Sequence, residues 1–174
     1  MKEFQSNKLR FILLACPFCR ATKPTWSYHD SYERYLVSYE NERTITYQID
    51  ITRIICSSCK HTHAILPDII IPHSSYSLVF VLVVLKDYFS GKMKIQVICE
   101  KYDISTSMLY VWKKLFFIHK KIWLGILEDI AQEPLFFLTS NFTNNITEAL
   151  THFFLQNAYS FLQGISKTAN FSSA

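Results

Sequence analysis

The sequence has only three glycines, at positions 91, 125 and 164. Loops that cradle nucleotide phosphates need several glycines close together, so a nucleotide-binding loop is excluded. Acidic residues are scarce as well, and Glu148 is the only one after Glu133. A metal-dependent nuclease or transposase domain needs paired carboxylates around its metal ions. No such pair and no Ser/His/Asp arrangement stands out, so we expect a protein that is not an enzyme.

A long apolar segment is also lacking. The longest run, LVFVLVVL from Leu78 to Leu85, has eight residues, whereas a helix needs about 20 to span a membrane. The stretch FILLAC (Phe11 to Cys16) resembles a lipoprotein cleavage site, but its apolar part is too short for a signal peptide. We therefore expect a cytoplasmic protein without membrane contact, whose cysteines stay reduced and favour metal binding.

Hydrophobic and aromatic residues are abundant, at 49% and 16% of the 174 residues, which indicates a folded chain. The net charge of +4 is unevenly distributed. Between Lys86 and Lys121 there are eight lysines and three acidic residues, a local excess of five positive charges. The middle of the chain is therefore electropositive, and the C-terminal part is nearly neutral.

Four of the five cysteines form two close pairs, CPFC (Cys16 and Cys19) and CSSC (Cys56 and Cys59). The short spacing lets each pair form a tight turn that directs both sulfurs toward one point. Two such pairs supply the four thiolates of a tetrahedral zinc site. Four protein ligands leave no open position for water or substrate, so we predict one structural Zn²⁺.

Two alternatives to this ligand set are considered. CPFC could be a thioredoxin-like redox pair, but that chemistry needs a following helix in a βαβ context, and a second CxxC is present. His61 or His63 could replace a cysteine. Because they are two residues apart in an extended chain, at most one of them points toward the metal.

The 36 residues between the pairs exceed the usual zinc pattern, and their own pattern explains why. From Thr44 to Thr52 apolar and polar residues alternate, which predicts a half-buried strand running into the second pair. Tyr32–Tyr39 predicts a preceding strand, and Glu40–Arg43 a polar turn. We therefore expect a β-hairpin insert that brings both cysteine pairs to one place.

The pattern then becomes helical. LVFVLVVL predicts a buried helix, capped by Ser75 or Ser77 and stopped by Gly91. The following segment, Ile95–Trp112, has the residue order of a helix-turn-helix.

Within this segment Cys99 takes the small buried position where the first helix touches the second. Asp103 takes the turn position, which needs a positive φ that Asp tolerates. Ile104 anchors the turn and Ser105 caps the second helix. We therefore expect Cys99 to be a core thiol and not a metal ligand.

If the second helix enters a DNA major groove, its exposed N-terminal residues meet base edges and a lysine stripe meets phosphates. The residues expected to contact double-stranded DNA are Thr106, Ser107, Tyr110, Lys113, Lys114, Lys120 and Lys121. The alternative is a solvated lysine face on an ordinary helical bundle.

These segments together resemble a known group of proteins. CPFC, the tyrosine-rich hairpin, RIICSSCKHTHAILPDIIIPHSSYS and ISTSMLYVWKKLFFIHKKIWLGILED cover most of the chain. They resemble an uncharacterised bacterial family with a zinc ribbon and a helix-turn-helix, which is similar to the N-terminal DNA-binding region of insertion-sequence transposases. The resemblance implies DNA binding in a mobile-element context. One departure is Val111, which stands where such helices often carry an arginine that reads guanine.

The C-terminal third predicts an amphipathic helix. Asn145 and Glu148 have the spacing of a capping box, and Gly164 provides a stop. We expect the apolar stripe between them to pack on the preceding helices. A face for a homo-oligomer or for a transposition partner protein is the alternative.

The sequence therefore predicts an α+β fold, with a small β zinc ribbon at 1–72, an all-α helix-turn-helix region at 73–133 and a C-terminal helical segment at 134–174. The expected function is that of a DNA-binding protein of the transposase-related, mobile-element type without a catalytic domain. The alternative is a zinc-stabilised protein–protein interaction module that does not bind nucleic acid.

Overall fold

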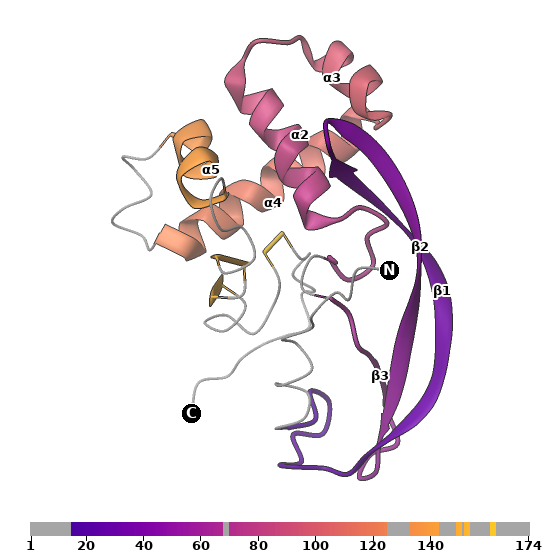
Figure 1. The fold of residues 1–174 in the computed structure, drawn as a ribbon. Helices are drawn as coiled ribbons and strands as arrows, with labels where there is room; N and C mark the ends of the chain where they lie inside the picture. Colours follow the sequence, from indigo (N-terminus) through magenta and orange to yellow (C-terminus); the bar gives the residue numbers. More distant parts are fainter. Residues whose placement is uncertain are drawn as a thin grey trace.

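The structure, a computed structural model, describes residues 15–67, 70–124, 133–142, 149–150, 152–153 and 161–162. In these residues a three-stranded antiparallel sheet is followed by four helices, the α+β class that the sequence predicts (Figure 1). The elements are β1 (Trp26–Glu40), β2 (Arg43–Cys56), β3 (Thr62–Ala64), α2 (Leu78–Ser90), α3 (Ile95–Tyr102), α4 (Thr106–Leu124) and α5 (Pro134–Phe142).

Strands β1 and β2 form the predicted hairpin. They pair on both sides of a bulge between Tyr28 and Asp30, around a turn at Asn41 and Glu42, whose φ angles of 49° and 61° suit a two-residue hairpin turn. Both strands extend farther toward the cysteines than their alternation indicates, and Trp26 lies opposite Cys56. The hairpin therefore runs from the helices to the far end of the molecule (Figure 1).

The third strand, β3, has only three residues and pairs antiparallel with β2, with His63 opposite Ile54. The sequence analysis did not predict it, because three residues are too few to show an alternating pattern. The strand forms because the chain reverses direction at the second cysteine pair and returns along β2.

The helices enclose the main hydrophobic core. Helix α2 packs against α3, α4, α5 and β1, as its uninterrupted apolar sequence predicts. Val37 and Tyr39 of β1 pack against the same core, so the hairpin and the helices share it. The largest fully buried side chains of this core are Phe80, Phe116, Phe137, Phe153, Phe161, Leu78, Leu85, Ile98 and Leu109.

Ser77 joins the hairpin to the helices. Its Oγ accepts the N–H of Phe80 at 3.1 Å, so Ser77, and not Ser75, caps α2. The same hydroxyl donates to Ser38 Oγ at 3.0 Å, and the backbone N–H of Ser77 donates to the carbonyl oxygen of Val37 at 2.8 Å. Because these groups are buried, the start of α2 is fixed firmly against β1.

The turn between α3 and α4 has the predicted geometry. Asp103 ends α3 in the left-handed conformation, with φ 50° and ψ 52°. Ile104 is buried, and its N–H donates to the carbonyl oxygen of Cys99 at 3.0 Å. Ser105 Oγ accepts the N–H of Met108 at 3.2 Å, so Ser105 caps α4 as expected.

Asp87 links α2 to α3 through two hydrogen bonds. Lys101 Nζ and Tyr102 Oη both donate to Asp87 Oδ2 at 2.7 Å. Burial alone raises the pKa of Asp87, but these two donors outweigh it and hold the pKa below its usual value. The carboxylate therefore stays charged and fixes the angle between the two helices.

The predicted C-terminal helix lies largely outside the described residues, and so do Asn145, Glu148 and Gly164. Its described apolar residues are buried in the helical core, as expected for a segment that packs on the preceding helices; they are Leu150, Phe153, Phe161 and Leu162. Among the helices that the structure describes, none combines the length and apolar character needed to span a membrane.

Gly91 offers a test of the helix boundary. It ends α2 with φ 65°, and a Cβ built there would meet nothing within 4 Å. Gly91→Ala therefore adds only backbone strain, and we expect it to lower the free energy of unfolding by about 1 kcal/mol and Tm by about 2–4 °C. Gly91→Asn is expected to lower it less, because Asn tolerates this conformation. Thermal and urea unfolding followed by circular dichroism measure both; an alanine variant as stable as the wild type would contradict the assignment.

Candidate metal centre

The four paired cysteines meet at the end of the hairpin that is remote from the helices. Their Sγ atoms all lie within 4.8 Å of one another. The Sγ atoms of Cys16 and Cys59 are 3.7 Å apart, and those of Cys19 and Cys56 are 3.9 Å apart. Four sulfurs at 2.3 Å from a tetrahedral Zn²⁺ would be separated by about 3.8 Å. The donor set and its spacing therefore fit a zinc ion.

Each cysteine pair lies in a knuckle, a tight turn of six residues, and the two knuckles have the same backbone. In the first, residues 16–21, the N–H of Cys16 donates to the carbonyl oxygen of Ala21 at 3.0 Å. The N–H of Arg20 donates to the carbonyl oxygen of Cys16 at 2.9 Å. The second knuckle, residues 56–61, repeats both bonds at 3.0 and 2.9 Å. Each turn therefore presents its two sulfurs on one side, as the CxxC spacing predicts.

The hairpin brings the knuckles together. Antiparallel pairing returns the chain to its starting point, so Trp26, near the first knuckle, lies opposite Cys56. The N–H of Ser57, in the second knuckle, donates to the carbonyl oxygen of Thr25 at 3.0 Å and links this knuckle to the residue before β1. The long insert between the cysteine pairs is thus an extended ribbon whose two ends meet at the sulfurs.

The thiols interact strongly with one another. Burial alone raises the pKa of Cys56, but the backbone N–H groups of Cys59 and Ser58 and two neighbouring thiols lower it to about 6. The N–H of His61 lowers the pKa of Cys59, but burial and three neighbouring thiols raise it to about 12. These opposite shifts belong to the cluster as a whole: the first proton leaves readily, and later ones leave against the charge already formed. A bound cation removes that repulsion.

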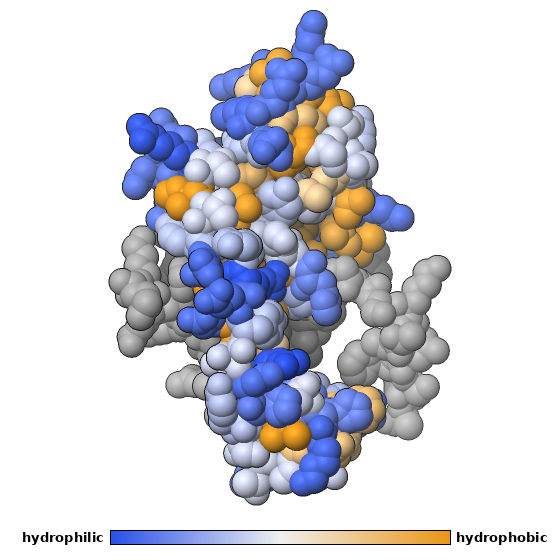
Figure 2. Space-filling view, turned by 90° about the vertical axis from the view of Figure 1, so that its right-hand side faces the viewer, coloured by the Kyte–Doolittle hydropathy of each residue, from blue (hydrophilic) through white to orange (hydrophobic). Residues whose placement is uncertain are grey.

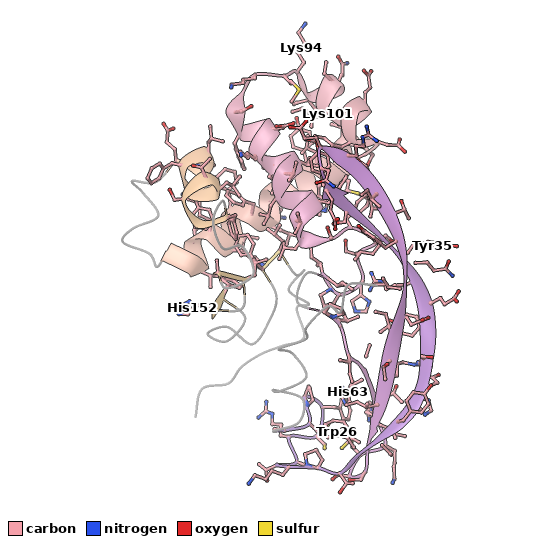
Figure 3. The ribbon with its side chains drawn as sticks, viewed as in Figure 1. Trp26, Tyr35, His63, Lys94, Lys101 and His152 are labelled. Carbon is pink, nitrogen blue, oxygen red and sulfur yellow. The ribbon has the colours of Figure 1, made fainter. Side chains whose placement is uncertain are left out.

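The two histidines point to different sides, as expected in an extended chain. His63 Nε2 lies 3.5 Å from Cys16 Sγ, and the ring meets Trp26 edge-on at 5.3 Å (Figure 3). His61 instead stacks on Phe18, with ring centroids 3.4 Å apart. The four sulfurs form the cluster without either histidine, and His63 contacts it from outside.

Cys99 lies apart from this cluster. It belongs to α3, at the opposite end of the molecule from the knuckles (Figure 1). Its half-buried side chain packs against the helical core, and its Sγ is 3.7 Å from Thr106 Oγ1. The structure therefore agrees with the expectation that Cys99 is a packing residue.

Five of the seven residues expected to contact DNA are exposed along α4. Their positions recur at intervals of three, four and seven residues, so they share one face of the helix. They are Thr106, Ser107, Tyr110, Lys114 and Lys121.

The other two lysines face inward. Lys113 is half-buried, and its Nζ donates to Tyr88 Oη at 2.7 Å, which ties α4 to α2. Lys120 has only 3% of its surface exposed. The expectation that Lys120 adds to an exposed lysine stripe is therefore wrong. Residues seven positions apart share a helix face, and the face that carries Lys113 and Lys120 turns toward the core.

The sequence analysis missed the apolar character of the exposed face of α4. Val111, Ile118 and Ile122 are exposed between and beside the polar residues, with 56% of Val111 accessible. The periodicity of α4 alone could have placed Val111 outward, because it precedes the buried Trp112 and follows Ser107 by one helical turn.

A family model described as a domain of unknown function (DUF6431) matches residues 16–106. No curated protein and no solved structure matches the chain. The matched segment begins at the first cysteine of the cluster and ends at the first residue of α4. It contains both knuckles, the whole hairpin, α2, α3 and the turn after α3. Because this match covers more than half of the chain, the protein belongs to the DUF6431 family.

Proposed function

We propose that the protein binds double-stranded DNA through α3 and α4, and that its four-cysteine centre holds one structural Zn²⁺. The observation that carries the DNA proposal is the turn itself. A left-handed Asp103, a buried Ile104 and a capping Ser105 join two helices and leave the first turns of α4 exposed. This is the geometry by which a helix-turn-helix presents its second helix to a major groove.

The zinc proposal rests on the donor set and on how little else supports the ribbon. Four sulfur ligands at tetrahedral spacing favour zinc or iron, and a site closed by four protein ligands suits a structural role. Among the described residues, the ribbon's own hydrophobic cluster has three buried members, Leu36, Ile51 and Ile70, and the half-buried Tyr47, Ile49, Ala64 and Leu66 pack against them. A core of that size supplies little folding free energy, whereas a structural zinc site supplies about 10 kcal/mol or more.

Contacts to phosphates are expected to contribute more to the binding free energy than contacts to bases. Thr106, Ser107 and Tyr110 occupy the part of α4 that would approach the base edges, and Lys114 and Lys121 lie farther along the same face. Val111 is exposed where an arginine would read guanine. We therefore propose binding with weak sequence preference.

The mobile-element setting rests on the resemblance to the DNA-binding region of insertion-sequence transposases. The scarcity of carboxylates after Glu133 supports a binding protein or accessory factor that lacks its own catalytic domain. In this proposal the protein works in the cytoplasm, where thiolates stay reduced.

A second candidate is a zinc-stabilised protein-interaction module. The observation in its favour is the apolar part of the exposed face of α4, where Val111, Ile118 and Ile122 are accessible. Exposed apolar residues on one helix face suit a protein partner, including a second copy of the chain. The two candidates differ in their dependence on salt, because phosphate contacts weaken as salt rises and apolar contacts do not.

Metal analysis tests the centre. Cys56→Ser is expected to reduce the zinc content from one ion per chain to none and to unfold the ribbon, because Cys56 is fully buried among the other thiols. Cys99→Ala is the matched control and is expected to keep one ion. Zinc is measured by elemental analysis, and ribbon order by amide hydrogen exchange of β1 and β2. Zinc loss from the Cys99 variant, or zinc retained by the Cys56 variant, would show that the ligand set is wrong.

Binding to duplex DNA tests the helix. Lys114→Glu is expected to weaken binding about tenfold or more at moderate salt, and to make the plot of log affinity against log salt shallower by about one. Lys114 is chosen over Lys113 because Lys113 also holds Tyr88. Lys86→Glu is the control, since it makes the same charge change on an exposed position of α2. Affinity is measured by fluorescence anisotropy with a 30-base-pair duplex over a salt series.

The same titrations decide between the two candidates. Equal losses in the Lys114 and Lys86 variants would argue against a specific role of the α4 face. Binding to duplex DNA that does not change with salt, combined with loss of self-association in an Ile118→Glu variant, would support the interaction module instead.

A further inference from the structure

Two basic residues occupy unfavourable backbone conformations at equivalent places in the two knuckles. Arg20 follows the second cysteine of the first knuckle with φ 59°, and Lys60 follows the second cysteine of the second knuckle with φ 61°. Glycine adopts this left-handed region freely, whereas a side chain there costs free energy. Both residues are exposed, so packing does not explain them. The turn itself imposes this conformation, because the N–H groups of Arg20 and Lys60 donate to the carbonyl oxygen of the first cysteine of their own knuckle. A basic side chain at both positions, where glycine would be more stable, suggests a function for its charge.

The surroundings of these residues are positively charged. Residues 15–29 and 54–67 contain Arg20, Lys23 and Lys60 and no aspartate or glutamate. Arg53, just before the second of these segments, is paired with Asp30. Lys23 is also exposed and has φ 47°. Within the described part of the chain, none of the three knuckle cations forms an ion pair with an acidic side chain.

A flat aromatic pair belongs to the same two knuckles. Phe18 is 62% exposed and stacks on His61 with their planes 20° apart. Phe18 belongs to the first knuckle and His61 to the second, so the pair lies across the junction of the two turns. Figure 2 shows the lower end of the molecule, where the knuckles lie, as mostly hydrophilic with small hydrophobic patches. Cations around an exposed aromatic surface are the features that contact a nucleic-acid backbone and its sugars.

This surface is separate from α4. Figure 1 places the knuckles and the helices at opposite ends of the hairpin. Strand β1 has 15 residues and is therefore about 50 Å long, more than one turn of duplex DNA, which is about 34–36 Å. Glu33 and Asp50 are cross-strand neighbours in the middle of the ribbon, and both are exposed. Their carboxylates would repel phosphates there. A duplex that touched both ends would thus be held at two distinct points.

We propose that Arg20, Lys23 and Lys60, with the Phe18–His61 pair, form a second contact to the phosphate backbone of the duplex that α4 binds. This inference rests on the proposed function. The knuckles keep basic residues where glycine would be more stable because the side chains reach phosphates. Binding at two separated points increases affinity without requiring sequence recognition.

Glycine substitution tests this without threatening the fold. Arg20→Gly with Lys60→Gly removes two cations and also relieves both strained backbones. The full-length double variant should keep one zinc ion per chain and unfold at the same temperature as the wild type or a higher one. Its affinity for a 30-base-pair duplex should fall at least tenfold, and the salt plot should become shallower by about two, because two phosphate contacts are lost.

Two controls separate charge from backbone. Arg20→Lys with Lys60→Arg keeps both charges and should bind DNA with the wild-type salt dependence. Asn41→Gly relieves a left-handed residue, with φ 49°, at the opposite end of the hairpin and changes no charge. It should leave DNA affinity unchanged.

The outcomes are distinct. If the wild type binds DNA in a salt-dependent manner and the double glycine variant binds with the same affinity and salt dependence, the knuckle contact is refuted and the proposed function stands. If the double variant binds zinc more weakly, the two cations serve to neutralise the thiolates, and the inference is overturned. If the wild type does not bind duplex DNA, the proposed function fails and this inference fails with it.

Discussion

Four thiols from two distant segments of the chain lie within 4.8 Å of one another, and this cluster closes the remote end of the sheet. The ribbon has few buried residues of its own, so packing alone gives its far end little stability. Its near end is different, because Val37 and Ser77 bind it to the helices and Val37 and Tyr39 enter the main core. The hairpin therefore ends in unlike interactions, a four-cysteine cluster at one end and apolar packing at the other.

This arrangement explains which features the sequence could predict. CxxC spacing, strand alternation and the order Asp103, Ile104, Ser105 each encode local geometry, and each was found where expected. Features that depend on how elements meet were not predictable. Strand β3 forms only because the second knuckle reverses the chain against β2. The inward direction of Lys120 depends on how α4 rotates against the core, which the spacing of its lysines cannot show. His61 and His63 point to different sides, as their spacing in an extended chain predicts, but the stacking of His61 on Phe18 joins two distant segments and is not encoded locally.

The family match covers the first part of the molecule and leaves most of α4 outside it. It covers the cysteine cluster, the hairpin and the first helices, and it ends where α4 begins. The region that characterises the family is thus the ribbon with its four-cysteine cluster, together with the turn that precedes α4. The exposed face of α4 lies almost wholly beyond it, so its mixture of lysine, tyrosine and aliphatic residues must be interpreted from this chain alone.

The shortage of glycine bears on the knuckles as well. Among the described residues, eight residues other than glycine have positive φ. Asn41 and Asp103 tolerate this conformation because their short polar side chains can form local hydrogen bonds. Arg20, Lys23 and Lys60 have no such compensation, yet all three lie in or beside the knuckles and all three are cationic. Helix ends use either residue type, since Gly91 ends α2 and Asp103 ends α3 in this conformation. Under the proposed DNA contact, the positive charge of these three side chains outweighs the strain that their positions impose on the backbone.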